Sequence, residues 1–147
     1  MKSSATVVLC LVAICLYGLS LFLPAFSCVR TAGFPGYMVL AVGYMGLLVL
    51  DPRWFGNVGF LVLLFATLKS PTRTHPIIVG ATALLAIASF AQAVGCPGGG
   101  GAPEGSVGLA IGGYLWVAAL LIACIANFSL QHKSRTNAPE TRNSSES

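Results

Sequence analysis

Two cysteines stand where the chain could carry thiol chemistry. Cys28 follows the first long apolar run, and Cys96 lies at the start of a glycine-rich segment at residues 95–105. On the outer side of a membrane, an oxidising compartment would permit a disulfide between them; they could equally remain free thiols. Redox exchange needs a resolving thiol close to the attacking one, as in Cys-x-x-Cys. The chain has no pair at that spacing, so catalysis by these cysteines is disfavoured.

The sequence predicts a polar spot at residues 51–57. Asp51 and Arg53 interrupt an otherwise apolar stretch, and Trp54 and Asn57 come directly after them. One interpretation is a surface turn, with the charges among lipid headgroups and the indole at the membrane interface. The other is a spot that recognises a headgroup or a partner. Lipid cannot satisfy polar side chains within helices, so we expect four of them to face other helices: Asn57, Ser89, Gln92 and Asn127.

The remaining polar residues argue against several functional classes. His75 and His132 lie in separate polar segments, and neither is close to a cysteine that would suggest a metal site. The four glycines at residues 98–101 lack the Lys-Ser/Thr that follows a phosphate loop. Charged residues are absent from the middle of every apolar run, which argues against ion-coupled transport. We predict no enzymatic activity, no cofactor, no metal and no nucleic-acid partner.

The composition indicates a membrane protein. The chain is 56% hydrophobic and 8% charged, whereas soluble domains carry about 25% charged residues. A helix needs about 20 apolar residues to cross a bilayer, and four runs approach or exceed that length: residues 6–26, 54–70, 76–94 and 106–130. We therefore predict an all-α integral membrane bundle at residues 1–130, followed by a disordered polar cytoplasmic tail at residues 131–147.

Residues 33–50 leave the number of crossings open between four and five. As a short helix near residues 37–50, interfacial or re-entrant, they give four crossings; as a fifth span, they give five. Both topologies place six basic residues inside and two outside, so the positive-inside rule does not separate them. Four crossings are favoured because Lys2 precedes the first helix and because the stretch has only 18 residues, four of them glycines. Both termini are then cytoplasmic, and Cys28 and Cys96 share the outer side.

Gly108 and Gly112 form a GxxxG pair in the last apolar run. Such a face lets two helix backbones approach closely. The pair could serve packing within the bundle or form the seam of a homodimer.

Several short strings resemble a group of small bacterial inner-membrane proteins with several helices. Residues 19–26 read LSLFLPAF, and a Gly-Tyr pair at residues 36–37 and glycines at 43 and 46 follow. A Trp-x-x-Asn element at residues 54–57 and a Gly-Tyr-x-Trp element at residues 113–116 complete the likeness. One departure is Val58, where the group tends to have proline. The resemblance implies the fold and a bacterial inner membrane, and it implies no reaction.

Two functional hypotheses result. The first is a non-enzymatic membrane protein that packs against a partner or against itself. The second is a protein that handles a small molecule or lipid, or a redox accessory that uses Cys28 and Cys96.

Overall fold

The computed structural model describes residues 4–27, 34–43, 52–69, 75–90, 94–95 and 106–136. Within these ranges the chain is mainly helical, which confirms the predicted helical class. The elements are α1 (Ser4–Phe22), β1 (Phe26–Ser27), α2 (Gly36–Val42), the 3-10 turn η2 (Pro52–Trp54), α3 (Phe55–Lys69), α4 (Pro76–Ala88), β2 (Val94–Gly95), β3 (Ser106–Leu109) and α5 (Ile111–Thr136).

Proline and local caps set several helix boundaries. Pro24 disfavours helical geometry at the residue before it, and α1 ends at Phe22. Pro76 occupies the first turn of α4, where a missing N–H costs nothing, and His75 Nδ1 accepts a hydrogen bond from the Ile77 N–H at 3.4 Å. α4 ends in a tightened turn, in which the Phe90 N–H donates to the Ile87 carbonyl at 3.0 Å.

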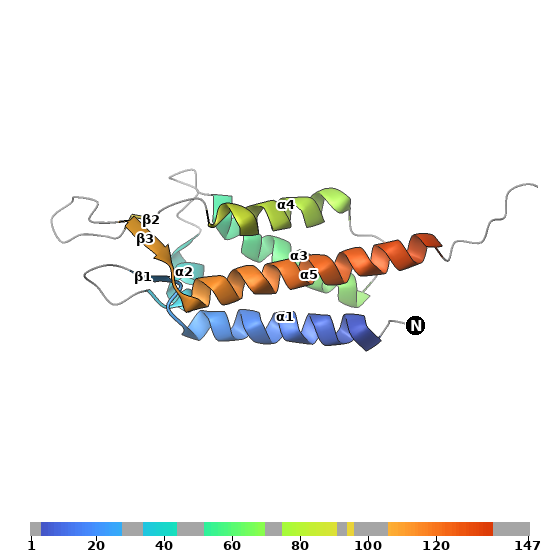
Figure 1. Cartoon of the computed structure of the whole chain (residues 1–147), viewed down its shortest axis with the longest axis horizontal. Coiled ribbons are helices and arrows are strands. Elements are labelled where there is room, and N and C mark those ends of the chain that lie inside the picture. The colour runs from blue at the N-terminus through green and yellow to red at the C-terminus, as the bar shows by residue number, and fades with distance from the viewer. Residues whose placement is uncertain are drawn as a thin grey trace, which may run out of the picture.

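Four helices form an elongated bundle (Figure 1). Helix α5 contacts α1, α3 and α4, and α3 also contacts α4. The core therefore lies around α5. It consists mostly of small or medium side chains, and the buried hydrophobic residues that form its main cluster are Ala13, Phe60, Ala86, Val117, Ala119, Leu120 and Ala123.

One end of the bundle, here called the cap end, carries α2 and a small sheet (Figure 1). The strands are antiparallel in the order β1-β3-β2, with Phe26 opposite Leu109 and Val94 opposite Val107. The apolar runs predict helix at residues 23–26 and 106–109, and this prediction is wrong. The backbone groups of these two segments form hydrogen bonds to each other instead, and the Ala110 N–H donates to the Ala25 carbonyl at 2.9 Å.

Helix α2 stays at the cap end. The Ala25 N–H bonds to the Phe34 carbonyl just before α2, and the Leu40 carbonyl within α2 accepts from Trp54 Nε1. The segment between residues 34 and 54 thus begins and ends at the same end of the bundle. The short helix predicted at residues 37–50 is observed at Gly36–Val42, and residues 44–51 lie outside the described ranges.

The helices differ from the predicted spans in length. Among the described residues, two helices are long and apolar enough to cross a membrane by length and composition: α1, with 19 residues, and the 21-residue part Ile111–Gln131 of α5. α3 has 15 residues and α4 has 13, both shorter than the predicted 54–70 and 76–94. α5 continues to Thr136, so residues 131–136 of the predicted disordered tail are helical.

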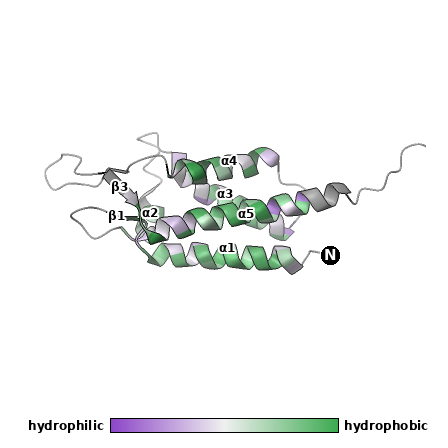
Figure 2. Ribbon diagram, in the orientation of Figure 1, coloured by the Kyte–Doolittle hydropathy of each residue, from purple (hydrophilic) through white to green (hydrophobic). Residues whose placement is uncertain are grey.

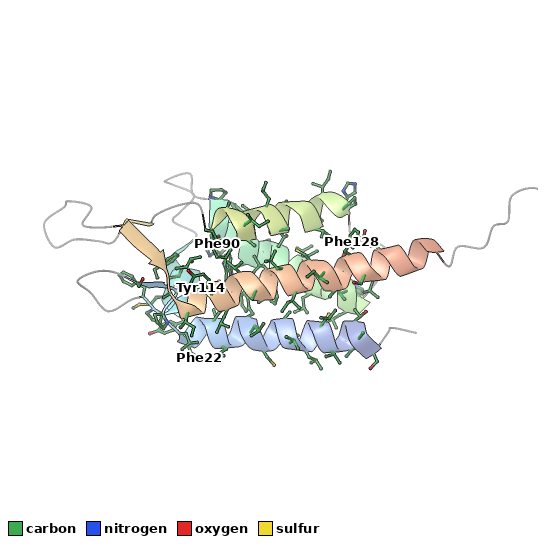
Figure 3. All side chains as sticks on the ribbon, in the orientation of Figure 1. Phe22, Phe90, Tyr114 and Phe128 are labelled. Carbon is green, nitrogen blue, oxygen red and sulfur yellow. The ribbon has the colours of Figure 1, made fainter. Side chains whose placement is uncertain are left out.

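The helices consist largely of hydrophobic residues (Figure 2), and side chains project outward from them (Figure 3). Leu11 on α1, Phe65 on α3, Leu84 on α4 and Phe128 on α5 are all more than half exposed. By contrast, the buried polar side chains among the described residues are Thr6, Ser20, Thr67, Thr82, Ser89 and Asn127. The bundle therefore places bulky hydrocarbon outside and many small or polar groups inside.

Candidate functional site

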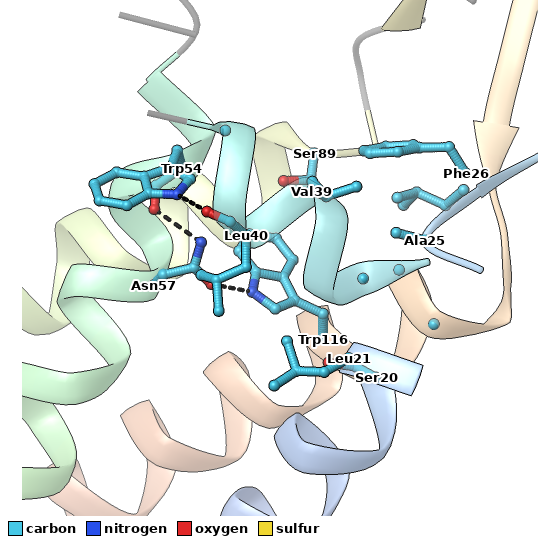
Figure 4. A pocket seen from close by; sticks show the side chains of 15 residues that line it. Ser20, Leu21, Ala25, Phe26, Val39, Leu40, Trp54, Asn57, Ser89 and Trp116 are labelled. Carbon is cyan, nitrogen blue, oxygen red and sulfur yellow. Dashed lines mark hydrogen bonds between the residues drawn. The ribbon is translucent and has the colours of Figure 1, made fainter. Parts of the chain in front are cut away.

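A cavity of about 220 Å³ lies at the cap end of the bundle (Figure 4). Its wall comes from the end of α1, the inner face of α2, the turn η2, the start of α3, the residue after α4, and the β3–α5 junction. The fifteen described residues that line it are Ser20, Leu21, Ala25, Phe26, Gly36, Val39, Leu40, Gly43, Trp54, Asn57, Ser89, Leu109, Gly112, Gly113 and Trp116.

Helix α2 covers the cavity with a single face. Gly36, Val39, Leu40 and Gly43 line it, and their spacing of three and four residues places them on one side of a helix. Tyr37, by contrast, is exposed. α2 therefore has two apolar sides, of which one lines the cavity and the other is exposed on the outside of the bundle.

Two glycines allow α2 to lie this close. A Cβ atom at Gly36 would collide with the Ser20 carbonyl oxygen, and one at Gly43 would collide with the Trp54 indole ring. The Gly36 N–H also donates to the Leu23 carbonyl at 3.0 Å. The N-terminal end of α2 is thus held by backbone contacts, whereas its C-terminal end packs against a tryptophan side chain.

Trp54 joins α2 to α3. Its indole Nε1 donates to the Leu40 carbonyl at 3.0 Å, and its own carbonyl accepts from Asn57 Nδ2 at 3.1 Å. The Trp-x-x-Asn spacing explains the second bond, since an Asn side chain three residues on can reach back to a preceding carbonyl. Trp54 and Asn57, two members of the predicted polar spot, therefore form one wall of the cavity (Figure 4).

Asn57 is the centre of a hydrogen-bond network between three helices. Its Oδ1 accepts from Trp116 Nε1 at 2.7 Å and from the Tyr17 hydroxyl at 2.9 Å. Tyr17 also stacks on Phe60, with ring centroids 4.4 Å apart and planes 6° from parallel. One amide thus fixes α1 and α5 against α3, which confirms that Asn57 faces other helices.

The hydroxyl groups of the wall already donate to the protein. Ser20 Oγ donates to the Tyr17 carbonyl at 2.6 Å, and Ser89 Oγ donates to the Leu85 carbonyl at 2.9 Å. The fifteen described wall residues include no ionisable side chain. The wall therefore offers apolar contact and a few hydrogen bonds to an uncharged molecule.

A second polar cluster lies toward the opposite end of the bundle. Asn127 is fully buried and donates through Nδ2 to Thr67 Oγ1 at 3.2 Å, and its Oδ1 accepts from Gln131 Nε2 at 2.9 Å. This confirms the expectation that Asn127 faces another helix. The cluster joins α3 to α5.

The other predicted site residues either lie outside the described residues or do not line up on one helix face. Cys28, Cys96 and Asp51 lie outside the described residues, as does the side chain of Arg53. Gly108 lies in β3 with open space around it, so it is not part of the predicted helical GxxxG face. Gly112, in α5, packs against the carbonyl oxygens of residues 23 and 24 inside the bundle.

Sequence reasoning missed Tyr17, Ser20 and Trp116 as members of the site. Trp116 belonged to a string noted for its likeness to other proteins, but nothing in its spacing indicated a bond to Asn57. Comparisons of the chain with family models, with curated proteins and with solved structures give no match. The function is therefore argued from this chain's own residues.

Proposed function

We propose that the chain is a multi-pass integral membrane protein that binds an uncharged, largely apolar small molecule in the cap-end cavity, without catalysis. The observation that carries the proposal is the cavity itself, whose described wall combines two indoles and aliphatic side chains with no ionisable group. Cavities of this composition are typical binding sites for small molecules.

The distribution of side chains supports a bilayer as the surroundings. Large apolar residues are exposed along all four helices of the bundle, and in water a fully exposed side chain of this kind forgoes about 1.5–3 kcal/mol of burial free energy. Buried hydroxyls instead bond within their own helices, as Thr67 does with the Leu63 carbonyl and Thr82 with the Ile78 carbonyl. This arrangement suits a solvent that offers no hydrogen bonds.

Four crossings fit the bundle. α1, α3, α4 and α5 all run along its length, while α2 stays at one end (Figure 1). α3 and α4 extend about 22 Å and 20 Å at 1.5 Å per residue, less than the roughly 30 Å of hydrocarbon. A locally thinner bilayer accommodates such spans at modest cost. Lys69 ends α3 away from the cap end, so the positive-inside rule puts the cap end outside.

The resemblance to small bacterial inner-membrane proteins supports that membrane as the location, with both termini in the cytoplasm. A homodimer seam at Gly108 and Gly112 loses its basis, because Gly108 is not helical and Gly112 packs within the bundle. Binding of a small molecule is therefore favoured over helix packing with a second copy.

Tryptophan fluorescence tests the proposal directly. The chain has two tryptophans, and both line the cavity. We expect trace amounts of a brominated dodecanol, added to nanodiscs of unbrominated lipid, to quench the emission saturably. A matched reporter carries Trp54→Phe, Trp116→Phe and Phe128→Trp, which moves the indole to an exposed position on α5. Its quenching should rise linearly; the same linear rise in the native protein would refute binding in the cavity.

A further inference from the structure

We infer that the ligand of the cavity is a hydrocarbon chain that carries a hydroxyl group, an inference that rests on the proposed function and specifies its ligand. Three features of the cavity favour such a ligand: the hydrogen-bonding capacity left on the wall, the absence of charge on its described residues, and the level of the cavity in the bundle.

The side-chain donors of the wall are nearly all in use. Both indole N–H groups donate to the protein, from Trp54 to the Leu40 carbonyl and from Trp116 to Asn57 Oδ1. The structure assigns one of the two Asn57 amide hydrogens, to the Trp54 carbonyl. The second amide hydrogen is therefore the donor that Asn57 can still offer a ligand.

Acceptors remain on the two serines. Ser20 and Ser89 give their hydroxyl protons to helix carbonyls, and a hydroxyl oxygen that donates keeps lone pairs that can accept. Both residues are buried and both line the cavity. A ligand must therefore donate a hydrogen bond to use them, and a hydroxyl group can both donate and accept.

Other ligand classes fit this wall less well. A quinone or an ester only accepts hydrogen bonds, so it leaves the serine oxygens unused. A carboxylate or phosphate would be buried beside no cationic group of the described wall, and an unpaired charge is costly to bury. The chemistry therefore selects a neutral alcohol over a carbonyl compound or an anion.

The size and level of the cavity fit the polar end of such a molecule. At about 30 Å³ for each water-sized group, a volume of about 220 Å³ holds roughly seven such groups. That accommodates a hydroxyl and the first part of a chain, and the rest of a longer chain has to lie outside. The cavity sits where α1 ends and α5 begins, the level at which hydrocarbon meets headgroups.

Competition in the fluorescence assay tests the ligand class. Brominated dodecanol is the probe, and dodecanol, dodecane, dodecanoate and decyl quinone are the competitors, each in nanodiscs of neutral lipid. We expect dodecanol to displace the probe at the lowest mole fraction, roughly two- to tenfold below dodecane, which is the range that one net hydrogen bond gives. Equal competition by dodecane, or stronger competition by the quinone or carboxylate, would overturn the hydroxyl inference while leaving saturable binding intact. No saturable quenching at all would instead refute the proposed function and this inference together.

Serine variants test the inference through the preference for dodecanol over dodecane, which would not change if the serines had only a structural role. Ser20→Ala and Ser89→Ala should each reduce the preference for dodecanol over dodecane while probe quenching stays saturable. Ser129→Ala is the matched control, because Ser129 makes the same type of bond, to the Ile125 carbonyl at 2.9 Å, on the exposed side of α5. An unchanged alcohol preference in both cavity variants would contradict the inference.

Discussion

Asn57→Ala is expected to destabilise the bundle by about 2 kcal/mol or more. The substitution removes the acceptor shared by Tyr17 and Trp116 and the donor to the Trp54 carbonyl. Hydrogen bonds between membrane helices contribute about 0.6 kcal/mol each on average and up to about 1.7. Three bonds lost together therefore give about 2 kcal/mol, and up to about 5 at the upper limit. Unfolding of the purified protein by sodium dodecyl sulfate in mixed micelles measures the change.

Two controls separate the network from general effects of truncation. Val58→Ala shortens the neighbouring side chain, which is exposed, and should leave the midpoint nearly unchanged. Tyr17→Phe removes one of the three bonds while keeping the ring on Phe60, and should cost about a third as much. If Asn57→Ala were no worse than Val58→Ala, Asn57 would not hold the helices together.

Gly112→Ala is expected to lower stability by roughly 1–3 kcal/mol, the usual cost of overpacking. A Cβ atom there would lie 2.7 Å from the Leu23 carbonyl oxygen and 2.8 Å from that of Pro24. These are backbone atoms and cannot rotate away. α5 would have to shift, and the bond from the Gly112 N–H to the Pro24 carbonyl, 2.9 Å long, would break. The same unfolding assay measures the loss.

Gly18→Ala is the matched substitution for this prediction. Gly18 lies inside α1 with nothing within 4 Å of its would-be Cβ, and alanine favours a helix over glycine by up to about 1 kcal/mol. The variant should therefore be as stable as the native protein or slightly more stable. Equal destabilisation by both substitutions would show that the close approach at Gly112 is not what matters.

The sequence allowed the helical class and the positions of the long helices to be predicted, because apolar runs of this length have few other structures. It did not allow the cap-end strands to be predicted. Residues 106–109 continue the apolar run of the helix that follows them, and a short apolar run does not distinguish helix from strand. Their partner, β1, lies about eighty residues earlier in the chain, a pairing that local patterns do not encode.

In the candidate site, too, contacts between residues close in sequence are predictable, whereas contacts between distant residues are not. Trp54 and Asn57 are three residues apart in the sequence and bond to one another, a contact that local spacing indicates. Their bonds to Tyr17 and Trp116 depend on how three helices are rotated about their axes, which apolar composition leaves undetermined. The Gly108–Gly112 pair misled for a related reason: the GxxxG spacing has meaning only within a helix, and the helix begins at Ile111.

The proposed topology has four helices that cross a bilayer with the cap end outside. Labelling of single cysteines tests it most directly, after the five native cysteines have been replaced by alanine. Tyr37→Cys reports on the cap end, and His75→Cys reports on the opposite end; both positions are exposed. An impermeant maleimide applied to intact cells should label position 37 at once and position 75 only after the membrane is permeabilised. Labelling of both positions from the same side would contradict the account.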